Sequence, residues 1–175
     1  MMLSKQLPMA LAASLFLVSG GLQAATDGTQ GTTSSGSADI TVTKQSEVKI
    51  SGLADIALDV QADGSATGST GACIYRNGSG SYTVTANSGN GSGDFRLKDT
   101  SDNVMVYTVS FNDGTNTTAL TEGTALTGQT NANTITPTCN GGSNATIEVT
   151  VSQTEFNGAP AGTYTDTLTL LIAPE

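Results

Sequence analysis

Alternation of apolar and polar residues dominates the sequence from residue 81 onward. Apolar and polar side chains alternate with period two along a strand that is buried on one face. Five segments show this pattern and are predicted to be strands: residues 81–87, 94–99, 103–112, 144–151 and 163–172. Turn-forming pairs such as Asn-Gly and Asp-Gly separate them. The polar segment 113–134 is expected to be a long surface loop with room for one short edge strand. Short strands punctuated by turns indicate an all-β sandwich.

Residues 38–50 carry an unusually long alternating pattern. The even positions hold the apolar residues, interrupted by polar residues at 44–46: Ala38, Ile40, Val42, Val48 and Ile50. A strand of this length would span roughly 43 Å, against about 17–20 Å for an ordinary strand, and no turn signal folds it back. Two interpretations stay open. Either an overlong edge strand lies on its own sheet, or the first part, residues 38–45, reaches a neighbouring molecule by strand addition.

The strand predicted last in the chain has one apolar face. That face carries Tyr164, Leu168, Leu170 and Ile172, and threonines occupy the other. No further strand is predicted after it, so an uncovered edge is expected, which must pair with something to avoid aggregation. The alternative is that the first strand of the same chain covers this edge and completes the sandwich.

The first 37 residues indicate an exported chain. Residues 1–24 combine Lys5, a short apolar run and a small residue at Ala24, the pattern of a secretory signal peptide. Residues 25–37 are a Gly/Ser/Thr tract and are predicted to be a flexible leader. An oxidising destination favours a disulfide between Cys73 and Cys139, with two free thiols as the alternative.

Composition excludes several classes of function. The net charge is −9, with six Lys and Arg against fifteen Asp and Glu, so no basic patch can attract nucleic acid. The chain has no histidine, which removes the commonest general base and metal ligand. Carboxylate pairs such as Asp55 and Asp59 are interpreted as solvated charges. We therefore predict no enzyme, no catalytic residue, no metal site and no cofactor.

Several stretches together resemble a known protein family. They are ADITVTKQSEVKISGLADIALDV, then CIYRNGSGSYTVTAN with DFRLKD and VMVYTVSFND, then TCNGGSNATIEVTV, and finally AGTYTDTLTLLIAPE. In this order they are similar to the chaperone–usher pilus subunits, of the archaic branch that includes the spore coat protein U-like domains. The resemblance covers residues 36–175.

This resemblance implies a fold and a set of partners. The fold would be an immunoglobulin-like, pilin-type β-sandwich over residues 38–175 that lacks its last strand and is completed by a donor strand. A periplasmic chaperone would lend that strand, an outer-membrane usher would export the subunit, and the next pilus subunit would replace the chaperone. Carried over to this sequence, Ala38, Ile40 and Val42 would be donor-strand residues, and Tyr164, Leu168, Leu170 and Ile172 would line the acceptor groove.

The expected function is therefore structural. The leading hypothesis is an exported subunit of a bacterial surface fimbria that polymerises by donor-strand exchange and serves adhesion or biofilm formation. The alternative is a monomeric secreted immunoglobulin-like module that binds glycans or a surface.

Overall fold

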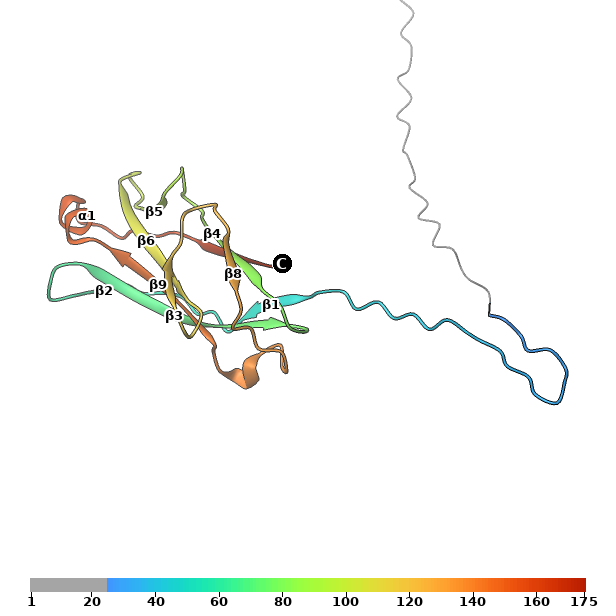
Figure 1. The fold of residues 1–175 in the computed structure, drawn as a ribbon. Coiled ribbons are helices and arrows are strands. Elements are labelled where there is room, and N and C mark those ends of the chain that lie inside the picture. Colours follow the sequence, from blue (N-terminus) through green and yellow to red (C-terminus); the bar gives the residue numbers. More distant parts are fainter. Residues whose placement is uncertain (1–24) are drawn as a thin grey trace, which may run out of the picture. The chain divides into compact units, whose positions relative to one another are not determined.

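The structure, a computed structural model, describes residues 25–175 and divides the chain into two units (Figure 1). One unit ends at Lys44 and the other, here called the body, runs from Gln45 to Glu175. The predicted signal peptide, residues 1–24, lies outside the described residues. Across residues 25–175, no helix has the length and apolar character needed to span a membrane.

The leader, which in the structure comprises the predicted tract 25–37 together with residues 38–44, contains no regular strand. Thr26 and Ser37 form an isolated antiparallel bridge, with N–H···O distances of 2.9 and 3.0 Å, and this bridge closes a Gly/Ser/Thr loop. Residues 38–47 have no regular secondary structure, so a continuous strand over residues 38–50 is not present. The side chains of Ile40 and Val42 are 96% and 91% exposed.

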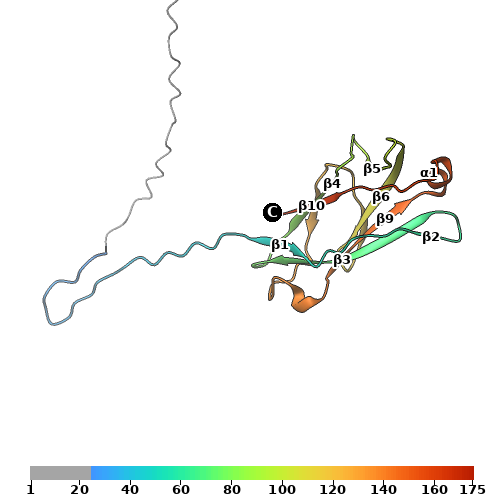
Figure 2. The same ribbon diagram turned by 180° about the vertical axis from the view of Figure 1, so that it is seen from behind.

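The body is a β-sandwich of two antiparallel sheets (Figures 1 and 2). The larger sheet has the order β1-β3-β9-β6-β5, with β2 also paired to β3 and β7 to β6. Its strands are β1 (Val48–Ser51), β2 (Asp59–Val60), β3 (Ala66–Arg76), β5 (Phe95–Lys98), β6 (Val104–Asn112), β7 (Thr117–Ala119) and β9 (Ala145–Val151). The smaller sheet has the order β10-β4-β8, formed by β4 (Tyr82–Ser88), β8 (Leu126–Gln129) and β10 (Leu168–Pro174).

The core lies between the inward faces of these strands. Alternate residues of β4, β6 and β9 are buried, as period-two side-chain alternation requires: Tyr82, Val84 and Ala86, then Met105, Tyr107, Val109 and Phe111, then Ala145, Ile147, Val149 and Val151. The predicted all-β sandwich and the strands predicted at residues 81–87, 94–99, 103–112 and 144–151 are confirmed.

Three local predictions need correction. The segment predicted as strand 163–172 becomes a strand only at Leu168, and before it Thr165 forms an isolated bridge with Lys98 of β5. The predicted loop 113–134 contains β7 and β8 and buries Leu120. A helix that was not predicted, α1 (Gln153–Gly158), follows β9.

The predicted disulfide is confirmed. Cys73 of β3 is bonded to Cys139, 66 positions further along the chain. Cys139 begins the short 3-10 helix η1 (Cys139–Gly141). The bond therefore ties the irregular segment before β9 to the longest strand of the larger sheet.

Candidate functional site

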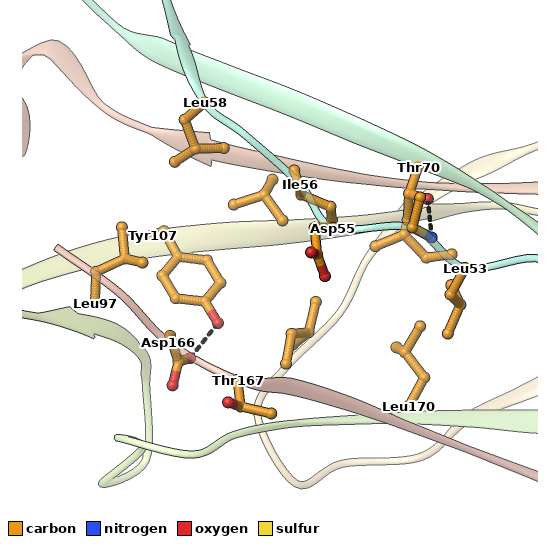
Figure 3. A pocket seen from close by; sticks show the side chains of 14 residues that line it. Leu53, Asp55, Ile56, Leu58, Thr70, Leu97, Tyr107, Asp166, Thr167 and Leu170 are labelled. Atoms are coloured by element: carbon orange, nitrogen blue, oxygen red, sulfur yellow. Dashed lines mark hydrogen bonds between the residues drawn. The ribbon is translucent and has the colours of Figure 1, made fainter. Parts of the chain in front are cut away.

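An open groove runs between the segment 53–58 and the start of β10 (Figure 3). Two adjoining cavities of about 420 and 660 Å³ form it, and both are lined by Ile56, Leu58, Leu97 and Asp166. Most of the remaining lining is apolar. Such a groove fits an extended apolar segment better than a compact polar ligand.

One wall of the groove is a stretch of chain that has left the sheet. β1 pairs with residues 73–76 of β3 and β2 pairs with residues 66–67, but the residues between β1 and β2 form no strand pairs. Instead, the backbone N–H of Ala54 donates to Oγ1 of Thr70, at 3.0 Å. This detachment places the side chains of Leu53, Ile56 and Leu58 along the groove (Figure 3).

The other wall is the open edge of β10. The C=O of Thr167 accepts from Gly89 at 2.9 Å, and the N–H of Glu175 donates to Ser81 at 3.0 Å. In an antiparallel ladder, bonds to one neighbour come from alternate residues, so the odd-numbered residues bond β4. The backbone groups of Leu168, Leu170 and Ile172 therefore face away from β4, where the sheet order places no further strand in the described part of the chain.

Core residues form the floor of the groove. Tyr107, Ile147 and Val149 line the first cavity, and Met105 and Val151 line the second. The same residues are at most 6% exposed and belong to the packed core. The groove is therefore an opening into the interior of the sandwich, between the edges of its two sheets.

Asp166 is a carboxylate set into this apolar surface. Its Oδ2 accepts from the hydroxyls of Tyr107 (2.5 Å) and Ser88 (2.6 Å), and its Oδ1 accepts from the backbone N–H of Asn90 (3.0 Å). Burial, and then the hydrogen bond to this carboxylate, raise the pKa of Tyr107 well above its usual value. Asp166 is thus held in a fixed position while it still lines both cavities.

The body also fixes the point where the leader ends. The Asn77 side chain donates to the C=O of Gln45 (2.8 Å) and accepts from the N–H of Glu47 (2.9 Å). The buried Arg76 guanidinium donates to the hydroxyl of Ser46 (3.5 Å) and to the main-chain oxygen of Glu175 (3.2 Å). The chain is therefore bound to the body from Gln45 onward, beside β1 and the end of β10.

Three of the four residues predicted to line an acceptor groove line one of the two cavities. Leu168 and Leu170 line the first cavity and Tyr164 the second, whereas Ile172 packs on the core without lining either. The predicted donor residues Ala38, Ile40 and Val42 are exposed in the leader, and their role stays a prediction.

Sequence reasoning missed part of the groove. The predicted domain, residues 38–175, contains Leu53, Ile56 and Leu58, but the sequence pattern did not identify them as a wall of the groove. It also missed Asp166, although a lone carboxylate between Tyr164 and Leu168 interrupts an apolar face in the sequence. That interruption was the available signal.

Comparisons with known proteins support the fold. No known family profile and no curated protein sequence matches the chain. A chain in the structure of a chaperone–tip adhesin complex from CFA/I fimbriae biogenesis is 19% identical, with a TM-score of 0.52 over 74% of this chain and 41% of that chain. A mutant of CfaE, the CFA/I adhesin of enterotoxigenic E. coli, is 21% identical, with a TM-score of 0.52 over 73% of this chain and 43% of that one. The chain thus spans about two fifths of each, and it shares their pilin-type β-sandwich.

Proposed function

We propose that the chain is an exported structural subunit of a bacterial surface fimbria that polymerises by donor-strand exchange. Residues 38–45 of one copy fill the groove of the next copy. One observation carries the proposal: the core of the sandwich is open along the unpaired edge of β10, while an alternating apolar segment of the same chain is exposed.

The dimensions of the two parts agree. β10 has seven residues, so the edge that faces away from β4 is about 20 Å long, and the first cavity opens along it at Leu168 and Leu170. Ala38, Ile40 and Val42 would span about 13 Å in an extended strand, which fits within that edge. Burial of the Ile40 and Val42 side chains contributes on the order of 3–6 kcal/mol, and backbone hydrogen bonds to β10 add to it.

An open core also implies helpers during export. Until another copy fills the groove, an exposed apolar edge invites aggregation, so a periplasmic chaperone that lends a strand is the expected first partner. The same proposal includes export by an outer-membrane usher and a final place in a surface fimbrium. It also includes membership of the archaic, spore coat protein U-like branch and a role in adhesion or biofilm. The fold shared with a chain of a chaperone–tip adhesin complex supports this partnership.

Deletion of the donor segment tests the proposal. A chain that lacks residues 36–45 should form no filaments and should be recovered as chaperone-bound monomer, because the groove of each copy then has nothing to receive. Electron microscopy and size-exclusion chromatography of the exported protein give the readout. Deletion of residues 26–35, of equal length, is the matched control and should leave polymerisation intact.

Filaments formed by the chain without residues 36–45 would refute the proposal. A stable monomer of the full mature chain, purified without any chaperone, would instead favour the alternative of a monomeric secreted binding module. Refolding the mature chain and measuring its mass in solution separates these outcomes.

A further inference from the structure

The leader and the groove wall carry matching sequence patterns. On the leader, Ala38, Ile40 and Val42 are followed in the same alternation by Lys44. On the wall, Ile172, Leu170 and Leu168 are preceded in the same alternation by Asp166. Each pattern therefore has three apolar residues and one charge, and the charges have opposite sign.

The two patterns match in one orientation only. If the leader runs antiparallel to β10 with Lys44 opposite Asp166, then Val42, Ile40 and Ala38 fall opposite Leu168, Leu170 and Ile172. Residues directly opposite in an antiparallel pair share one face of the sheet, so all the apolar side chains point to the core. In a parallel pairing that places Lys44 beside Asp166, Ile40 falls beside Gly162 and the apolar match is lost.

We propose that the groove of one copy receives residues 38–44 of a second copy in this antiparallel register, fixed by an ion pair between Lys44 and Asp166. This inference rests on the proposed function, and it specifies which residues fill the groove and in which register they pair with β10. The charge complementarity between the two segments is what selects a second copy of this chain as the occupant. Within residues 25–175, Lys44 is also the last leader residue before the chain is bound to the body at Gln45.

Asp166 is built to receive a cation. Three donors, from Tyr107, Ser88 and Asn90, already hold the carboxylate in place. Two carboxylate oxygens offer about four acceptor sites, so one remains for an ammonium group. A donor that is charged strengthens such a hydrogen bond, and a long lysine side chain can keep its stem on apolar surface while its head reaches the carboxylate.

The register also gives the assembly a direction. The leader leaves the body beside β1 and the end of β10, where Arg76 contacts both Ser46 and Glu175. Asp166 lies where the two cavities meet, and the second cavity continues from it to Phe156 and Asn157 of α1. In both views α1 lies at the opposite end of the body from the C-terminus (Figures 1 and 2). Contacts that join opposite ends of identical copies are heterologous, and they produce an open filament when the rotation between copies does not close into a ring.

Cysteine pairs on the outward face measure the register. Thr41 and Thr169 would be directly opposite, and both side chains are exposed, so neither substitution disturbs the core. The even-numbered residues of β10 would make the backbone hydrogen bonds to the inserted leader, so Thr41 and Thr169 would form a non-hydrogen-bonded pair. Their Cα atoms would be about 4.5 Å apart, within the range that a disulfide requires. The full chain carrying Thr41→Cys and Thr169→Cys should therefore give a ladder of disulfide-linked multimers on non-reducing gels.

Shifted pairs provide the matched controls. Thr41→Cys combined with Thr167→Cys, or with Leu171→Cys, displaces the register by two residues on the same face and should cross-link at least several-fold more slowly. Faster cross-linking of either shifted pair would overturn the register while leaving strand donation intact. Absence of cross-links for every pair would instead overturn the proposed function.

A charge test addresses the ion pair itself. Added to the chain that carries Thr41→Cys and Thr169→Cys, Lys44→Gln should reduce the rate of cross-linking roughly tenfold, since a hydrogen bond between charged groups is lost. When Asp166→Asn is also present, the same Lys44→Gln change should have little further effect, as expected of coupled residues. Lys49→Gln, the same charge change on β1, is the control and should leave the rate unchanged. If Lys44→Gln reduces the rate of cross-linking equally in chains with Asp166 and in chains with Asp166→Asn, the ion pair is refuted.

Discussion

Two buried tyrosines of the core differ in the partners of their hydroxyl groups. The hydroxyl of Tyr107 donates to Asp166, whereas among residues 25–175 the fully buried Tyr82 hydroxyl has no hydrogen-bond partner. Burial, with a smaller effect of Asp113, raises the pKa of Tyr82 to about 12. Both tyrosines are therefore neutral at physiological pH, and only one of them gains a compensating hydrogen bond.

Replacing each tyrosine by phenylalanine should give opposite results. Tyr107→Phe removes a hydrogen bond to a charged group and should lower the free energy of unfolding by about 1.5–3 kcal/mol. Tyr82→Phe removes an unpaired buried hydroxyl and should leave the free energy of unfolding unchanged or raise it. Urea unfolding at pH 7, followed by circular dichroism, measures both. A larger loss from Tyr82→Phe than from Tyr107→Phe would contradict this account.

The pH dependence supplies a second readout for the same pair. When the folded-state pKa of a tyrosine is raised, the free energy of unfolding depends on pH and is highest below the ordinary tyrosine pKa near 10. As pH rises above 10, the unfolded chain ionises first, so the free energy of unfolding should fall until the folded-state pKa is passed. Each phenylalanine variant should show a flatter decline between pH 10 and pH 12 than the native chain.

At the scale of elements, Gly68 of β3 explains why the groove wall stands away from its sheet. A Cβ atom on Gly68 would lie 2.8 Å from the Ile56 side chain and nearer still to the backbone oxygen of Ala57. The segment between β1 and β2 therefore passes directly over β3 at a position where only glycine leaves room. The wall that carries Ile56 and Leu58 depends on this close approach.

Gly68→Ala should displace this wall. The contact is with backbone, which cannot rotate away, so overpacking should cost about 1–3 kcal/mol of unfolding free energy and weaken strand capture. Gly158→Ala, where the structure leaves open space around the new methyl group, is the matched control. Thermal unfolding reports the loss of stability, and the rate of cross-linking between Thr41→Cys and Thr169→Cys reports strand capture. An unchanged stability in Gly68→Ala would show that the segment 56–58 is not held against β3.

The sequence predicted strands where alternation was clean and failed where another constraint was stronger. β3 was missed because Gly68 and Gly71 interrupt its pattern, and glycine is normally depleted in strands. The reason for one of these glycines, the chain crossing above Gly68, is a tertiary contact that local pattern does not contain. α1 was missed because it is short, although its capping signal was readable: the Ser152 hydroxyl accepts from the N–H of Glu155.

The groove could be predicted in part for a similar reason. Alternation alone identified Leu168 and Leu170 as one face of a strand, and they line a cavity. It could not identify the opposite wall, because Ile56 and Leu58 keep the period-two pattern of a strand although the chain has left the sheet there, and Leu53 lies outside that pattern. The interruption of the apolar face marked Asp166 in the sequence, but its fixed position depends on Tyr107, Ser88 and Asn90, all distant in sequence.

At the scale of the whole molecule, the disulfide compensates for a core that is open on one side. The bond between Cys73 and Cys139 closes a long loop that includes β4, β5, β6, β7 and β8. In the chain-entropy account, closing a loop of this length stabilises the fold by about 4 kcal/mol.

Removal of the disulfide should therefore be severe for an isolated subunit. Cys73→Ala with Cys139→Ala should lower the free energy of unfolding by about 3–4 kcal/mol, and addition of a peptide spanning residues 36–45 should recover part of it, because a ligand that binds only the folded state stabilises it. Urea unfolding of the variant with and without the peptide gives both numbers. A loss below about 1 kcal/mol would mean that the bond constrains little.

The chain leaves the body at Gln45, beside the end of β10 that lies away from Asp166, and this fixed exit has a mechanical consequence. Tension along a fibre joined in the proposed way would pull the inserted strand lengthwise past β10. Under such shear the backbone bonds along the edge bear the load together, whereas a strand peeled from one end would lose them one at a time. A joint made without any covalent link between subunits would then withstand far larger forces in flow than its few apolar contacts suggest.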